Sequence, residues 1–332
     1  MMKINSQKIK WVKHIVFFIV GAGLFIGLIY FINEESIQKL QEIQWKPFAG
    51  AFLVSIGITG TIAFRWGTIT NTLAGKKLAS WRQYYHYFIQ SRVLGFILPK
   101  DFTDFGVRIY WLKKSHNSRV SDASVSVFID RLYDLLAMLI LLAGVIPFWL
   151  GLFSETATYF FLASLTIICG GILAYNPNFL FFLMQQLLNF LIRFFSVLPF
   201  LKKHIPQSID IPDIKRKIVL RIYSASILKM VFTMLRFVFF AYAVNVIVDP
   251  NIIILGTPLG QVGYLFSFTP GGLGIFEAGW FGIFKLAKVS SQLALLFVVG
   301  QRIITMVIII GLAIISQMLN IFINYYTQID VN

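Results

Sequence analysis

Four arginines lie inside apolar segments of this chain, where an ionisable side chain is costly and so requires a partner or a ligand. They are Arg65, Arg131, Arg236 and Arg302. A guanidinium is planar, stays charged, and binds a phosphate through two parallel hydrogen bonds. The four arginines are therefore predicted to line a cationic central cavity for an anionic group such as a lipid phosphate.

Acidic side chains accompany the first of these arginines. Asp130 and Asp134 are one helical turn apart on either side of Arg131, so local neutralisation is expected. Asp104 lies earlier in the chain and is predicted to meet Arg131 or Arg108. These residues are predicted to orient or balance the arginines.

The second group of charges lies in the last third of the chain. Lys229 and Arg236 are seven residues apart, which places them on one face of a helix. Arg302 has no acid near it in sequence, and Glu277 is its predicted partner. The alternative for all of these charges is that they pair with one another and only fix helix packing.

Residues 267–277, SFTPGGLGIFE, form the sharpest motif. Pro270 is expected to end one half-helix, and Gly271, Gly272 and Gly274 allow a tight turn and close approach of a ligand. Amides exposed at the start of the next half-helix would bind an anion. The run lacks the Gly-Lys-Ser/Thr ending of a P-loop, and a plain tight turn is the alternative.

Residues for catalysis are scarce. The four histidines are scattered, and neither H-E-x-x-H, G-x-S-x-G nor a cluster of metal ligands occurs. Cys169, beside two glycines, is interpreted as a structural thiol. We therefore expect no catalytic residue, no metal and no cofactor. The alternative is a membrane-embedded lipid-modifying transferase, for which Asp104 with Asp130 is the single weak candidate.

The composition explains why charge inside apolar segments matters here. Hydrophobic residues make up 58% of the 332 residues and charged residues 13%, with a mean hydropathy of +0.77. Soluble proteins carry about 25% charged residues, so lipid must solvate much of this chain. A net charge of +15 suits anionic lipid, and the sequence has no nucleic-acid-binding motif. A single cysteine excludes a disulfide framework.

Apolar runs of spanning length predict an all-α polytopic membrane protein with about six full transmembrane helices. The runs cover residues 15–32, 47–70, 125–150, 158–175, 218–248 and 292–323. Residues 178–197 carry one polar stripe and are predicted to lie in the membrane interface, with a further span as the alternative.

Two pairs of short apolar segments are predicted to form re-entrant helical hairpins, because each piece is too short to cross a bilayer. The first pair is 84–98, ending at Pro99, and 105–112. The second is 252–269, ending at Pro270, and 275–286. Gly256, Pro258, Gly260 and Gly263 are expected to break the helix over 252–269.

Lysine and arginine counts predict the orientation. Residues 1–14, 71–124 and 176–221 hold 20 of them, whereas the loops predicted outside hold four. By the positive-inside rule, both termini of this multi-pass protein are predicted to face the cytoplasm, in the plasma membrane.

An offset of 171 residues superposes Arg65 on Arg236, Pro99 on Pro270 and Arg131 on Arg302. The match predicts two repeat units, over about 47–150 and 218–323. Both units belong to a single integral membrane domain, 1–332. A cytoplasmic or interfacial connector, 176–217, is predicted between them. The charge count makes the units inverted, as in many transporters. The alternative is a chance match in a very hydrophobic chain.

The order and spacing of these residues resemble a known family. The chain resembles the transmembrane domain of the lysylphosphatidylglycerol synthase/flippase family. The residues that carry the resemblance are, in chain order, Leu98-Pro99, Asp104, Arg108, Asp130-Arg131-Leu132, the stretch from Thr269 to Gly274, Glu277 and Arg302. The resemblance covers roughly 10–325. The first hairpin departs from it, because Lys100, Asp101 and Thr103 stand where the family usually has glycines.

The resemblance implies movement of a phospholipid or glycolipid between leaflets, with aminoacylated phosphatidylglycerol as the best-known cargo. It does not imply synthase activity, because no soluble aminoacyl-transfer domain fits in this chain. We therefore expect a flippase or transporter of an anionic phospholipid or lipid-linked sugar. A non-transporting scaffold is a further alternative, and a second copy of the chain or proteins of envelope-lipid synthesis are candidate partners.

Overall fold

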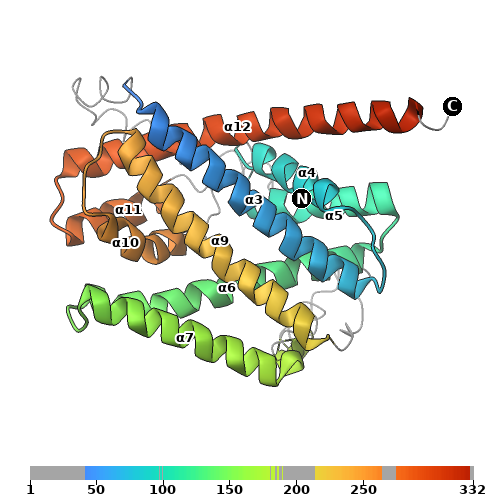
Figure 1. The fold of residues 1–332 in the computed structure, drawn as a ribbon, viewed down its shortest axis with the longest axis horizontal. Helices are drawn as coiled ribbons and strands as arrows, with labels where there is room; N and C mark the ends of the chain where they lie inside the picture. Colours follow the sequence, from blue (N-terminus) through green and yellow to red (C-terminus); the bar gives the residue numbers. More distant parts are fainter. Residues whose placement is uncertain are drawn as a thin grey trace, which may run out of the picture. The chain divides into compact units, whose positions relative to one another are not determined.

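The computed structural model describes residues 42–96, 98, 100–179, 181–183, 185–186, 189, 214–263 and 274–329. Every regular element in these ranges is a helix (Figure 1), which confirms the all-α prediction. The helices are α3 (Trp45–Leu73), α4 (Trp81–Leu94), α5 (Lys100–His116), α6 (Val120–Trp149), α7 (Glu155–Tyr175), α9 (Arg216–Ala243), α10 (Pro250–Val262), α11 (Ile275–Leu286) and α12 (Ser291–Ile329).

Five of these helices, α3, α6, α7, α9 and α12, are long and apolar enough to cross a membrane. They correspond to five of the six predicted spans, and the chain is a polytopic membrane protein. The first predicted span, 15–32, lies outside the described residues, as does most of 178–197.

Helix α9 ends at Ala243, five residues before the predicted boundary, because the chain turns at Asn245. Asn245 has φ 58°, in the left-handed region that asparagine tolerates better than most residues. The Val246 N–H then donates to the Ala241 carbonyl at 2.8 Å. Asp249 starts α10 by accepting from the Asn251 N–H at 2.9 Å, with Pro250 in the first turn.

The prediction that glycines and Pro258 break the helix before the second hairpin turn is wrong over most of its described part. Helix α10 continues through Gly256, Pro258 and Gly260, and it ends at Val262 with Gly263 as its cap, so only the break at Gly263 agrees with the prediction. These glycines allow close packing instead: a Cβ on Gly256 would lie 2.6 Å from Ile283 Cγ2, and one on Gly260 would lie 2.9 Å from the Trp280 ring. Helices α10 and α11 therefore pair closely, while re-entry into a membrane stays a prediction.

The described helices form two compact units. Unit 1 contains the residues up to Thr59, His86–Val107 and those from Val231 onward; unit 2 contains Gly60–Tyr85 and Arg108–Met230. Helices α3, α4, α5 and α9 contribute residues to both units. The single membrane domain and the inverted repeat over 47–150 and 218–323 stay predictions.

An aromatic core holds the helices of unit 1 together. Trp280 on α11 lies 4.9 Å from Phe237 on α9 and 4.8 Å from Phe297 on α12, between ring centroids. Both phenylalanines and Trp280 are fully buried. Because apolar burial adds little against lipid, close packing of this kind is the main stabilisation available. It fixes α11 and α12 side by side, which positions Glu277 and Arg302.

Candidate functional site

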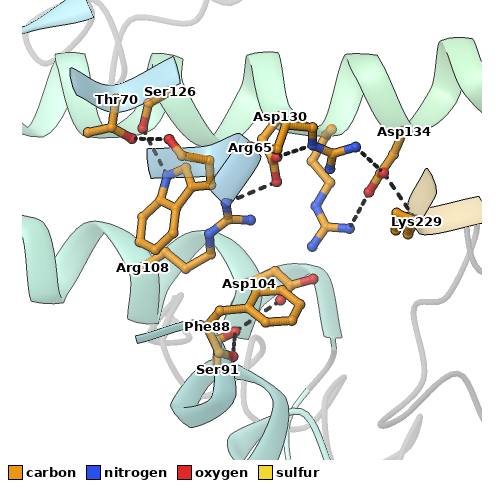
Figure 2. Close-up of polar contacts among 12 residues, drawn as sticks. Arg65, Thr70, Phe88, Ser91, Asp104, Arg108, Ser126, Asp130, Asp134 and Lys229 are labelled. Carbon is orange, nitrogen blue, oxygen red and sulfur yellow. Dashed lines mark hydrogen bonds and ion pairs between the residues drawn. The ribbon is translucent and has the colours of Figure 1, made fainter. Parts of the chain in front are cut away.

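A cluster of buried charges lies in unit 2, centred on two aspartates of α6 (Figure 2). Arg65 on α3 is buried and donates from Nε to Asp130 Oδ1 and from Nη1 to Asp134 Oδ1, both at 2.7 Å. Nη1 also donates to Ser226 Oγ on α9 at 2.9 Å. One guanidinium thus joins three helices.

The same aspartates collect further cations. Arg108 on α5 donates from Nη2 to Asp130 Oδ2 at 2.9 Å, and its guanidinium carbon lies 4.1 Å from the centroid of the Trp66 ring. Lys229 Nζ donates to Asp134 Oδ1 at 3.0 Å. The Trp66 indole is held in turn by the Ser126 hydroxyl, to which its Nε1 donates at 3.2 Å.

Arg131 makes the longest ion pair of this cluster, with Asp134 three residues later in the same helix. Its Nη1 lies 3.8 Å from Asp134 Oδ2, so the predicted contact exists, but Arg65 and Lys229 are closer to that aspartate. Within the described residues of unit 2, the cluster contains four cations and two carboxylates, Asp130 and Asp134, and so carries a formal charge of +2. Buried charges pay a large desolvation cost unless they are paired, which explains why both carboxylates are shared.

Asp104 lies in the part of α5 that belongs to unit 1 and is fully buried. Its Oδ1 accepts from Ser91 Oγ on α4 at 3.2 Å, and that hydroxyl also contacts the Phe88 carbonyl oxygen at 2.7 Å (Figure 2). Its predicted pairing with Arg108 or Arg131, which belong to unit 2, stays a prediction. The predicted turn residue Pro99 lies outside the described residues.

The predicted pairing of Arg302 with Glu277 is confirmed. Arg302 donates from Nε to Glu277 Oε1 at 2.9 Å, its Nη2 contacts the same oxygen, and both side chains are buried. The other oxygen, Oε2, accepts from the Gly274 N–H at 2.7 Å, at the start of α11. A carboxylate is favourable at this end of a helix dipole. Glu277 therefore occupies the helix start that the sequence assigned to an anionic ligand.

Glycine is required at position 274, where φ is 89°. The other members of the predicted turn, Pro270, Gly271 and Gly272, lie outside the described residues. The anion-binding role of this turn stays a prediction.

A small cavity in unit 1 is lined by two arginines, Arg92 of α4 and Arg236 of α9. The centre of a water molecule can occupy about 20 Å³ of it, enough for at least one water. The other residues that line it come from α3, α4, α9 and α12, and none carries a carboxylate: Ser55, Ile58, Thr59, Phe88, Ile89, Phe240, Thr305, Ile308, Ile309 and Leu312.

Aromatic rings contact both guanidinium groups of this cavity. The guanidinium carbon of Arg236 lies 5.4 Å from the centroid of Phe237 and 5.5 Å from that of Phe240. That of Arg92 lies 5.3 Å from the centroid of Phe88. Such contacts stabilise a cation in apolar surroundings.

Of the four predicted arginines, Arg236 lines this cavity, whereas Arg302 binds Glu277 and Arg65 binds the aspartates of unit 2. A cavity shared by all four stays a prediction. Sequence reasoning missed Arg92, which was counted only among the basic residues predicted to face the cytoplasm. Its place inside the apolar segment 84–98 was the signal that could have identified it.

Three comparisons with known proteins add to this geometry. A family model described as "Lysylphosphatidylglycerol synthase TM region" matches residues 18–313. No curated protein and no solved structure matches the chain.

Proposed function

The chain belongs to the lysylphosphatidylglycerol synthase TM-region family, and we propose that it moves an anionic phospholipid or a lipid-linked sugar between the leaflets of the plasma membrane. Membership of the family supports a function that involves membrane lipids. Transport, as distinct from catalysis or scaffolding, goes beyond this membership and is our proposal.

The cavity between Arg92 and Arg236 is the observation that carries this proposal. Two guanidinium groups suit a phosphate, and apolar side chains such as Ile58 and Ile308 suit the chain of an amphiphile. Ser55 and Thr59 donate their hydroxyl protons to carbonyl oxygens within α3, at 2.7 and 2.9 Å. The arginines therefore supply the attraction for an anion.

The cavity is smaller than a lipid headgroup. Space of about 20 Å³ for water centres is too little for a headgroup with its glycerol. The proposal therefore takes the described conformation as a closed one, and requires the helices around the cavity to part when lipid enters. Inverted repeats with short paired helices provide such movement in other transporters, and the predicted repeat and hairpins would have this role here.

Reconstituted liposomes test the proposal directly. Fluorescent phosphatidylglycerol is placed in both leaflets, and a membrane-impermeant quencher reports how fast the inner pool reaches the outside. We expect the wild-type protein to accelerate this exchange, and Arg92→Gln and Arg236→Gln each to slow it by about tenfold, since a charge-assisted hydrogen bond is worth more than 1 kcal/mol. Lys285→Gln, which removes an exposed cation of α11, is the matched control and should behave as wild type.

Two outcomes would overturn the proposal. If the double variant R92Q/R236Q exchanged lipid as fast as K285Q, the cavity would have no part in transport. If wild-type liposomes showed no exchange, recovery of chemically altered lipid would indicate a transferase, and unaltered lipid would favour a scaffold. Amounts of folded, inserted protein are matched by their chromatographic profile before rates are compared.

A further inference from the structure

A second polar cavity lies in unit 2, where α3 and α5 end and α6 begins. The centre of a water molecule can occupy about 190 Å³ of it, many times the space of one water. The residues that line it are Thr70, Ala74, Lys76, Leu78, His116, Asn117, Ser118, Arg119, Asp122 and Ala123. None of them belongs to the predicted transport site.

The first wall of this cavity is a short loop that carries Lys76. Gly75 turns the chain with φ 64°, directly after α3. Two residues beyond Lys76, the Leu78 N–H donates to Asn71 Oδ1 at 2.8 Å, and the same oxygen accepts from the Tyr84 hydroxyl at 2.9 Å. The backbone is therefore fixed on both sides of Lys76.

The second wall is the junction between α5 and α6. Asn117 has φ 49°, its N–H donates to the Lys113 carbonyl at 3.1 Å, and the Ser118 N–H donates to the Leu112 carbonyl at 3.4 Å. The bond from the Asn117 N–H to the Lys113 carbonyl, with Asn117 at positive φ, is the αL arrangement that ends a helix. It sets His116, Ser118 and Arg119 along one side of the cavity.

Helix α6 begins at this cavity without a side-chain cap. Its cap position is Arg119, whose guanidinium has no acceptor atom, in place of the serine, threonine or aspartate that usually accepts from the first amides. In the described structure, Ser118 Oγ is buried and has no hydrogen-bond partner. The cavity thus combines the positive end of a 30-residue helix with an unused hydroxyl.

The charges around the cavity favour an anion. Lys76 and Arg119 are cationic, and Asp122 is the one carboxylate among the lining residues, with its Oδ1 accepting from Ser121 Oγ at 3.1 Å. Partial burial lowers the pKa of His116, so its ring is neutral at pH 7, with one nitrogen that can donate a hydrogen bond and one that can accept. Two cations, a helix start and a hydroxyl suit a ligand with several oxygen acceptors.

We propose that this cavity binds a phosphate group, either on the headgroup of a membrane lipid or as free phosphate. Lys76 and Arg119 supply the charge, the first amides of α6 and Ser118 Oγ supply directed donors, and the size of the cavity admits a tetrahedral anion. The site is separate from the Arg92–Arg236 cavity in its residues and does not depend on the transport proposal.

Two probes and one pair of variants test the site. Inorganic phosphate is titrated into the purified full-length protein by calorimetry, and phosphatidylglycerol retained by the protein in mixed nanodiscs is counted by mass spectrometry. Lys76→Ala with Arg119→Ala should weaken one or both by about tenfold or more, because charge-assisted hydrogen bonds are lost. Lys77→Ala with Lys113→Ala removes the same charge from exposed positions outside the cavity lining and should match wild type.

Each outcome decides the proposal. Loss of phosphate binding in K76A/R119A identifies free phosphate as a ligand, and loss of retained phosphatidylglycerol identifies a lipid headgroup. Equal behaviour of K76A/R119A and K77A/K113A with both probes would overturn the site. Ser118→Ala, which keeps every charge, should weaken the same probe by a smaller factor, and this keeps the test valid if the double variant folds poorly. Lipid exchange through the other cavity is measured in parallel, so failure of one proposal does not imply failure of the other.

Discussion

Glu277 binds Arg302 with one carboxylate oxygen and the Gly274 amide with the other. A single side chain thus satisfies a buried guanidinium of α12 and caps the start of α11. A lipid phosphate that reached Arg302 would have to displace Glu277 or share the arginine with it. The pair is therefore a structural link in the described conformation.

A double-mutant cycle should show strong coupling between these two residues. Glu277→Ala and Arg302→Ala each leave a buried charge without its partner, and we expect each to lower the free energy of unfolding by about 3–5 kcal/mol. The double variant should cost less than the sum, with a coupling of up to about 3 kcal/mol. Unfolding in mixed detergent micelles measures all four proteins. Additive effects would mean that the pair contributes no mutual stabilisation.

The two aspartates of unit 2 should differ in their importance. Asp130→Asn removes the carboxylate shared by the fully buried guanidiniums of Arg65 and Arg108. Asp134→Asn also removes a partner of Arg65, which keeps Asp130. Its other partners, Lys229 and Arg131, are 16% and 28% exposed and can gain water. We expect Asp130→Asn to cost about 3–5 kcal/mol of unfolding free energy and Asp134→Asn clearly less. Melting temperatures in one detergent rank the two, and a reversed order would contradict this account.

The charge pairs show what the sequence could and could not predict. Glu277 was predictable because Arg302 had no nearer acid and the two lie in consecutive elements. The partners of Asp130 were not predictable, because Arg65 is 65 residues away on a separate helix and only tertiary packing brings them together. Arg92 was missed because the orientation count treats residues 71–124 as one cytoplasmic segment. That count ignores the position of Arg92 inside the apolar segment 84–98, where tertiary packing brings it to the cavity.

The five long helices begin and end within about six residues of the predicted apolar runs, and α11 covers the predicted range 275–286. The glycines of α10 were misread because a glycine in an apolar run marks either a break or a close helix contact, and only the partner helix distinguishes them. Here Ile283 and Trp280 lie against Gly256 and Gly260.

The close contact between α10 and α11 makes Gly256 sensitive to size. Gly256→Ala would place a methyl group 2.6 Å from Ile283 Cγ2, so either the helices separate or Ile283 changes rotamer. We expect a loss of about 1–3 kcal/mol in unfolding free energy, recovered in part by adding Ile283→Ala. Gly282→Ala on α11 is the control, because an added Cβ meets nothing within 4 Å there. Equal stability of the two single variants would show that the helices are not tightly apposed.

The orientation of the chain rests on the bias of lysine and arginine toward the predicted cytoplasmic segments, and it can be tested with single cysteines. Cys169 is the one native cysteine, so Cys169→Ser gives a background without thiols.

Ser154→Cys, in the exposed turn between α6 and α7, should react with a membrane-impermeant maleimide in intact cells. Lys77→Cys, in the exposed loop after α3, should react only after the membrane is permeabilised. The loop that carries Lys77 lies beside the start of α6 and Ser154 follows its end, so the two sites lie near opposite ends of α6. Lysines and arginines favour the inner side because translocating them is unfavourable. Labelling of Lys77→Cys in sealed cells would reverse the orientation, and would place the phosphate cavity beside Lys76 on the outer face of the membrane.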